Sequence, residues 1–220
     1  MKILIACEES QAVCIAFRNL EFEAYSCDIQ ECSGGHPEWH IKGDALIEAY
    51  SGKYEMMIAH PPCTYLSNAG ATFFDFDKYG NNALQRWHNR FEGAEFFMKL
   101  WLAPIKHICI ENPIGFMNHF MPCNQIIEPW YFGDEHKKRT GIWLKNLPKL
   151  TYALNDNLFE LQTASSEPKP IFIDKSGKAR YFNDAIYGFD REKSRKERSK
   201  TFQGIANAMA EQWSKLLTKS

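Results

Sequence analysis

Short apolar runs alternate with segments of helical periodicity along the first half of the chain. The apolar runs predict buried strands at residues 2–6, 23–29, 54–59 and 105–111. Apolar residues recur at every third or fourth position between these runs, over residues 9–20 and 81–102, which predicts amphipathic helices. Strands that alternate with helices indicate βαβ units and a mainly parallel sheet. We therefore expect an α/β fold whose ligands bind at the carboxyl ends of the strands.

The pattern is less regular after residue 113. A strand is expected at residues 140–144, and a closing helix at residues 201–217, with an apolar face that includes Ile205, Met209 and Trp213. Residues 148–182 contain proline and serine but little periodicity, which predicts an irregular insertion. We therefore divide the chain into a core at residues 1–145, a small insertion at 146–196, and a C-terminal helix at 197–220 that returns to the core.

Composition restricts the partners. The formal net charge is −1 over 220 residues, so contact with nucleic acid would have to come from local basic patches, such as residues 136–139 and 191–200. No apolar run approaches the roughly 18 residues of a membrane span. The first residues resemble a strand more than a signal peptide. The seven cysteines are an odd number, and free thiols in a reducing cytoplasm are the simplest interpretation.

Side chains with chemical potential follow the expected strands, and parallel strands end at one shared edge of a sheet. These side chains are Glu8, Asp28, Asp44, Cys63 and Glu111. An acid after the second strand commonly binds ribose hydroxyls. The chain has no G-x-G-x-x-G or P-loop motif, so a nucleoside cofactor without phosphates, such as S-adenosylmethionine, fits better than a pyrophosphate cofactor. Each single acid is equally compatible with a helix cap.

Cys63 and Glu111 form the more informative pair. A thiolate can add to C6 of a cytosine ring and make C5 nucleophilic, and a protonated carboxyl near N3 would neutralise the charge that develops on the ring. This chemistry needs an extruded or free base. Taken alone, Cys63 is typical of a structural cysteine in a proline-stiffened turn.

Several motifs resemble those of the DNA cytosine-C5 methyltransferases, particularly a compact phage and prophage branch. Residues 61–63 with 67–70 resemble the nucleophile motif of this family, and residues 111–113 resemble its Glu-Asn-Val motif. Gly43 and Asp44 are similar to the third cofactor motif, and residues 203–209 to the last motif. Lys138 and Arg139 are a looser match to the Gln-x-Arg-x-Arg motif.

The resemblance implies a Rossmann-like methyltransferase fold, S-adenosylmethionine as the cofactor and DNA as the partner. It implies that the core at residues 1–145 is catalytic and binds the cofactor, and that the insertion could recognise the substrate. The catalytic residues would be Cys63, Glu111 and Arg139. The cofactor would contact Ala6, Glu8, Asp28, Gly43, Asp44, Pro61 and Asn207. The substrate would contact Ser67, Asn68, Asn112 and Lys138, and no metal is expected.

Three departures and three alternatives accompany the resemblance: Pro113 stands where the Glu-Asn-Val motif has valine, the segment available for sequence recognition is only about fifty residues, and the first motif differs. Residues 5–10 replace the glycine-rich first motif of the family, so the donor pocket should differ in shape. An enzyme that modifies a free pyrimidine nucleotide could use the same cysteine, with a phosphate-binding cluster drawn from Arg139, Arg191, Arg195 and Arg198. A catalytically degenerate DNA-binding protein is the second alternative. The third is a zinc site built from Cys27, Cys32, His36 and His40.

Overall fold

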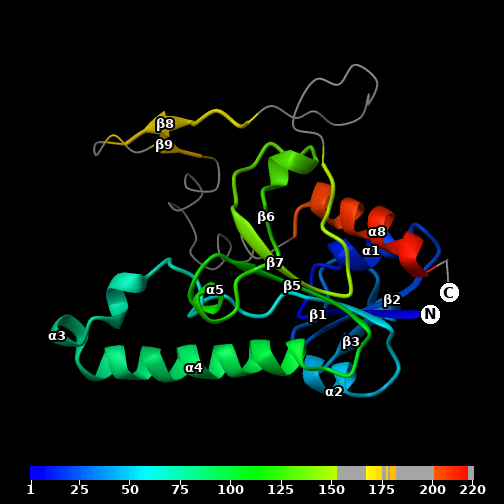
Figure 1. Cartoon of the computed structure of the whole chain (residues 1–220), viewed down its shortest axis with the longest axis horizontal. Coiled ribbons are helices and arrows are strands. Elements are labelled where there is room, and N and C mark those ends of the chain that lie inside the picture. Colours follow the sequence, from blue (N-terminus) through cyan, green and yellow to red (C-terminus); the bar gives the residue numbers. More distant parts are fainter. Residues whose placement is uncertain (153–166, 175–176, 178, 182–200, 218–220) are drawn as a thin grey trace.

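A seven-stranded, mostly parallel sheet forms the centre of the molecule (Figure 1). This computed structural model describes residues 1–152, 167–174, 177, 179–181 and 201–217. The strands lie in the order β3-β2-β1-β4-β5-β7-β6. Their bounds are β1 Lys2–Ala6, β2 Glu23–Asp28, β3 His40–Lys42, β4 Met56–Ala59, β5 His107–Pro113, β6 Gln125–Ile127 and β7 Thr140–Lys145.

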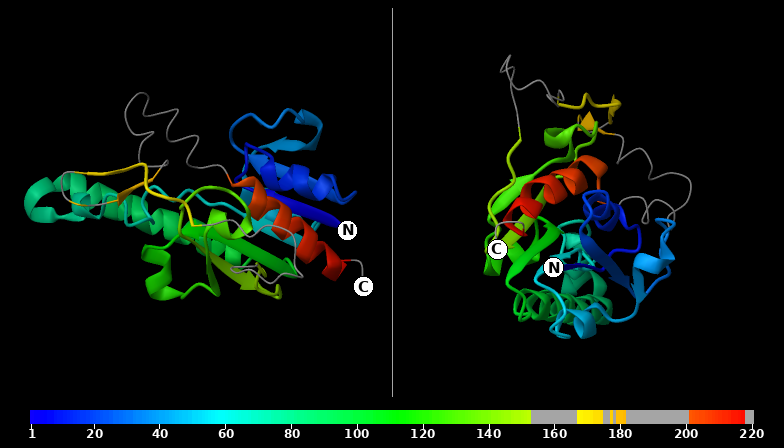
Figure 2. Two further views of the ribbon diagram at one scale, coloured as in Figure 1. Left: turned by 90° about the horizontal axis from the view of Figure 1, so that it is seen from above. Right: turned by 90° about the vertical axis from the view of Figure 1, so that its right-hand side faces the viewer.

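Helices cover both faces of this sheet (Figures 1 and 2). Helices α1 (Ala12–Arg18) and α8 (Gln203–Leu217) pack against each other on one face, and α2 (Ala45–Ala49) and α4 (Asn81–Trp101) lie on the other. Successive strand residues point to opposite faces, so Ile3 belongs to the first of these cores and Leu4 to the second. Burial on both sides explains why the strands are continuous apolar runs.

Shorter elements connect these layers. They are the 3-10 turns η1 (Pro37–Trp39), η2 (Ala71–Phe74) and η3 (Pro129–Phe132), the short helices α3 (Phe76–Tyr79) and α5 (Phe116–Phe120), and a hairpin of β8 (Phe172–Ile173) and β9 (Ala179–Arg180). None of the helices in the described part of the chain combines the length and apolarity of a membrane span.

The order of the strands indicates where a ligand crevice is expected. β3, β2, β1, β4 and β5 are parallel and follow the 3-2-1-4-5 order of doubly wound dinucleotide-binding folds, whereas β7 is antiparallel to both β5 and β6. The order reverses between β1 and β4, so a crevice is expected at their carboxyl ends. The predicted Rossmann-like α/β class with a mainly parallel sheet is confirmed.

Several boundaries differ from the expectation. Helix α1 begins at Ala12 and not at residue 9, because residues 9–11 form a loop in which Gln11 has a φ of 60°. The predicted apolar stripe of α4 is wrong in its first half, where Leu84 and Phe91 are 58% and 57% exposed. A helix of 21 residues is about 32 Å long. The four-residue strand β4 spans only about 13 Å, so the start of α4 extends beyond the sheet (Figure 1).

Part of the predicted organisation lies outside the described residues. This applies to most of the insertion at residues 146–196 and to the whole basic segment at residues 191–200, which includes Arg191, Arg195 and Arg198. The division of the chain at residues 145 and 196 stays a prediction.

Candidate active site

The segment of residues 60–70, here the Cys63 loop, leaves the carboxyl end of β4 at the crevice. Its start is fixed to β1, because the His60 N–H donates to the Ala6 carbonyl at 2.9 Å. Two prolines then restrict the backbone before Cys63. The Cys63 carbonyl accepts the N–H groups of Leu66 at 3.1 Å and Ser67 at 2.9 Å, which closes a turn behind the cysteine. The Cys63 side chain is partly exposed, as a reactive thiol must be.

The end of β5 holds the Cys63 loop in place. Asn112, which is 1% exposed, donates from Nδ2 to the Pro61 carbonyl at 2.8 Å. Ser67 pairs with Gly115 as an antiparallel bridge. A Cβ atom at Gly115 would lie 2.2 Å from the Leu66 carbonyl oxygen, so only glycine allows this approach. The two segments that resemble family motifs therefore form one packed unit.

Glu111 lies next to this unit, with a side chain that is 12% exposed. Its Oε2 atom is 3.1 Å from His60 Nδ1. Burial alone would raise the pKa of Glu111, but the Lys138 charge and the hydrogen bonds from His60 and Thr140 outweigh it and lower the pKa to about 2. The carboxyl group is therefore ionised at neutral pH.

His60 is the central residue that the sequence did not single out. Its side chain is 7% exposed. Its Nδ1 atom also lies 3.4 Å from Thr201 Oγ1, just before α8. Its Nε2 atom is buried and has no hydrogen-bond partner among the described residues. Its position, three residues before Cys63 and next to two prolines, was the only signal in the sequence.

Glu8 caps helix α1. It is 4% exposed, and its two carboxylate oxygens accept the N–H groups of Val13 at 2.7 Å and Cys14 at 3.2 Å. Burial raises its pKa, although His60 and the two N–H groups oppose this effect. A ligand at Glu8 would have to displace this cap. Ala6 is fully buried.

Asp28 is the last residue of β2, and Asp44 follows β3 by two residues, at the same edge of the sheet. Asp28 accepts the Gln30 N–H at 2.9 Å, and Asp44 caps α2 by accepting the Leu46 N–H at 2.8 Å. Neither carboxylate has an ion-pair partner in the described part of the chain. Burial raises the pKa of Cys7, and the charges of Asp28 and Asp44 add to this effect, which places all three side chains near one another.

The remaining candidates are divided between this site and other surfaces. The Lys138 charge acts on Glu111. Arg139 is exposed, and its charge acts on Cys123 and Glu128 instead. Asn207 is exposed on α8 and accepts a hydrogen bond from Gln203 at 2.8 Å. Of the substrate candidates in the Cys63 loop, Ser67 is half-buried and Asn68 is exposed. Gly43, a cofactor candidate, donates its N–H to the Asp28 carbonyl at 2.9 Å.

Three of the four donors of the alternative zinc site have separate partners. The Cys27 thiol lies 3.7 Å from the Gly43 carbonyl, His36 stacks on Trp39 at 3.9 Å, and His40 bonds to Ser26 at 2.9 Å. No group of three or more His, Cys, Asp or Glu side chains among the described residues could hold a metal ion.

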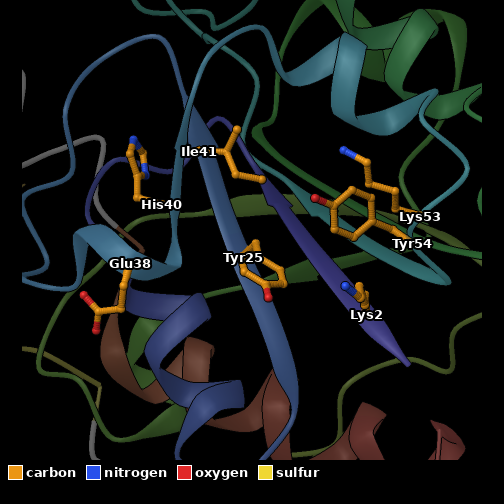
Figure 3. A pocket seen from close by; sticks show the side chains of 7 residues that line it. All are labelled: Lys2, Tyr25, Glu38, His40, Ile41, Lys53 and Tyr54. Atoms are coloured by element: carbon orange, nitrogen blue, oxygen red, sulfur yellow. The ribbon is translucent and has the colours of Figure 1, made fainter.

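A pocket of about 340 Å³ lies elsewhere, along β1 to β3 and the start of β4 (Figure 3). Its lining includes Lys2 at the amino end of β1, Tyr25 and Tyr54. It does not include Cys63 or Glu111, so it is not part of the crevice.

The sheet order and the side chains at its carboxyl edge define a Rossmann-like α/β protein with a candidate site between β1, β4 and β5. No protein-family model matches the sequence, and no curated protein is significantly similar to it. A crystal structure described provisionally as a DNA modification methyltransferase encoded within a prophage of E. coli is similar, with a TM-score of 0.40 and 12% identity. The match covers 87% of this chain and 56% of that one, so this chain spans little more than half of that protein's length.

Proposed function

We propose that this protein transfers a methyl group from S-adenosylmethionine to C5 of cytosine in DNA. The observation that carries the proposal is the packed unit of the Cys63 loop and the end of β5. The Asn112 bond to the Pro61 carbonyl at 2.8 Å fixes the loop that carries a partly exposed thiol to the strand that carries Glu111. Both lie at the crevice that doubly wound folds use for ligands.

Cys63 acts as the nucleophile. Its sulfur adds to C6 of an extruded cytosine, and the electron pair of the C5–C6 bond moves toward C5 and the ring. The bound cofactor supplies an electrophilic methyl group. After C5 has gained that methyl group, a solvent water molecule takes the C5 proton, and the electron pair of that C–H bond expels the Cys63 thiolate and restores the aromatic ring.

Glu111 and His60 handle the proton at the ring nitrogen together. A carboxyl group with a pKa of about 2 carries no proton at neutral pH, so Glu111 cannot act as the acid in its resting state. His60 Nδ1 lies 3.1 Å from Glu111 Oε2, which allows a proton to be shared between them. We propose that a base bound near Glu111 takes its N3 hydrogen bond from this pair.

The crevice fits a nucleoside cofactor in part. Asp28 and Asp44 each accept one backbone N–H and keep further acceptor capacity, so they would hold ribose hydroxyls and an adenine amine, with Gly43 and Pro61 beside them. Glu8 does not fit as a ligand while it caps α1. We propose that the cofactor is held from the β2 and β3 side of the crevice.

A mechanism-based substrate tests the proposal. The protein is incubated with the labelled donor and DNA that contains 5-fluorocytosine, which blocks loss of the C5 substituent and traps the adduct. We expect a covalent, labelled complex that is absent in Cys63→Ala and retained in Cys123→Ala, a matched change at another partly exposed thiol. No adduct from folded wild-type protein, with DNA or with 5-fluorodeoxycytidine monophosphate, would refute it. An adduct with the nucleotide alone would favour the nucleotide-modifying alternative.

A further inference from the structure

Two arginines of helix α4 lie directly against the Cys63 loop. Arg90 donates from Nε to the Tyr65 carbonyl at 2.8 Å. The Arg86 guanidinium lies 5.1 Å from the centre of the Tyr65 ring. Its Nη2 atom is 3.3 Å from the place that a Cβ atom on Gly70 would occupy. Both guanidinium groups therefore lie against the part of the loop that follows Cys63, both of them at Tyr65 and Arg86 also at Gly70.

Aromatic rings fix the positions of these guanidinium groups. The Arg90 guanidinium lies 3.4 Å from the centre of the Phe74 ring and 4.8 Å from that of Phe116. The Arg86 guanidinium lies 5.4 Å from the centre of Phe73 and 5.0 Å from that of Phe74. Such cation–π contacts hold a charge in place without neutralising it.

The two charges have no counter-charge among the side chains that the structure describes. No carboxylate among the described residues forms an ion pair with either arginine, although Arg90 is only 8% exposed. The Nε atom of Arg86 is buried and has no hydrogen-bond partner among these residues. Burial lowers the pKa of Arg90, and the neighbouring Arg86 charge lowers it further. Placing two like charges together away from water costs free energy unless an anion compensates for them.

We propose that Arg86 and Arg90 form a phosphate-binding site that holds the backbone phosphate of the nucleotide whose base reaches Cys63. The choice of a nucleic-acid strand rests on the proposed function. Planar guanidinium groups match the oxygens of a phosphate in a bidentate geometry. Contacts of this kind set the register of a strand without reading its sequence. Phe73, which is 46% exposed, and Phe91, which is 57% exposed, flank the pair and offer faces for neighbouring bases.

Binding measured against salt concentration tests this site. The affinity of the full chain for a fluorescent single-stranded oligonucleotide is measured by anisotropy at several salt concentrations, with inorganic phosphate and deoxycytidine monophosphate as competitors. We expect Arg86→Gln to weaken binding by on the order of tenfold. The slope of log affinity against log salt should become shallower by about 0.7 for each phosphate that the variant no longer neutralises. Lys99→Gln, about 20 Å further along α4, should change neither quantity.

A conservative variant separates charge from packing. Arg86→Lys keeps the charge but loses the planar stacking, so the salt slope should stay near that of the wild type. If Arg86→Lys lowers the slope as much as Arg86→Gln, or if Arg86→Gln leaves affinity and slope unchanged, the arginines are structural and the proposal is wrong. Absence of binding of both the oligonucleotide and the nucleotide by the wild-type chain would overturn it as well.

The competition experiment distinguishes a phosphate of a nucleic-acid strand from that of a free nucleotide. The adduct experiment distinguishes the phosphate site from the proposed methyl transfer. Competition by the mononucleotide at concentrations where inorganic phosphate has no effect would support the same site with a free nucleotide as its ligand. A salt slope that depends on Arg86 without any Cys63 adduct would support the phosphate site and reject the methyl transfer. If the Cys63 adduct forms and the DNA affinity is unchanged in Arg86→Gln, the methyl transfer is supported and the phosphate site is rejected.

Discussion

Replacing Glu111 with glutamine should remove a component of stability that depends on pH. The folded-state pKa of this carboxyl is lowered from its ordinary value of 4.5 to about 2. A group whose pKa is lowered by folding stabilises the native state above its unfolded pKa, and this contribution is lost as the pH falls toward the folded pKa. The window of interest is therefore pH 2 to 5.

The magnitude follows from this shift. Lowering the pKa of Glu111 from 4.5 to about 2 corresponds to about 3 kcal/mol of stabilisation of its ionised form. The side chain is only 12% exposed, so little of this is lost to screening by solvent. Glutamine fills a similar volume but does not compensate for the positive charge of Lys138. The variant should be less stable than the wild type by up to about 3 kcal/mol more at pH 6 than at pH 2.5.

Urea unfolding measured in steps between pH 2.5 and pH 7 provides the assay. All other carboxyl groups are common to both proteins, so the difference between their unfolding free energies isolates position 111. Glu92→Gln, on the exposed face of α4, is the matched control and should give a nearly constant difference. Parallel curves for Glu111→Gln and the wild type would refute the assignment of an ionised, stabilised carboxylate.

Four further substitutions test the packing and the crevice. Asn112→Ala removes the side-chain bond to the Cys63 loop and should cost about 1–3 kcal/mol in unfolding free energy, with a larger loss of adduct formation; full adduct rates would contradict this. Gly204→Ala places a Cβ atom 2.2 Å from a backbone carbonyl and should destabilise the protein by at least about 1–3 kcal/mol. Gly93→Ala is the control, because its Cβ atom meets only ordinary contacts at 3.6 Å, and it should leave the melting temperature nearly unchanged. Equal melting temperatures for Gly204→Ala and Gly93→Ala would contradict this expectation. Asp28→Asn should weaken the binding of S-adenosylhomocysteine, measured by calorimetry, by about tenfold. Unchanged binding would exclude Asp28 as a cofactor ligand.

The sequence predicted the parts of the fold whose signal is local. Strands that are buried on both faces are continuous apolar runs, so β1, β2, β4 and β5 were found within two residues at either end. The short strand β6 contains three residues and carries no periodicity. The stripe on α4 failed in its first half because periodicity shows which residues share a face, and not whether a sheet lies beneath them.

The candidate site was predicted in part for the same reason. The position of Cys63 after a strand could be read directly, and the structure brings its loop against Asn112. The role of Glu8 could not be read, since an acid after a strand suits a ligand or a helix cap equally well. Arg86 and Arg90 are ordinary basic residues in a helix until tertiary structure surrounds them with aromatic rings, with no ion-pair partner among the described carboxylates.

The contact between Thr201 and His60 has a consequence for the biosynthesis of this protein. A ribosome makes the Cys63 loop, β5 and β7 long before it makes α8, yet α8 packs on α1 and the residue just before it reaches His60. His60 therefore lacks its contact with Thr201, and α1 lacks the cover of α8, until residues 201–217 have emerged and docked. A nascent chain that stalls before residue 201 would display an uncovered apolar surface on α1.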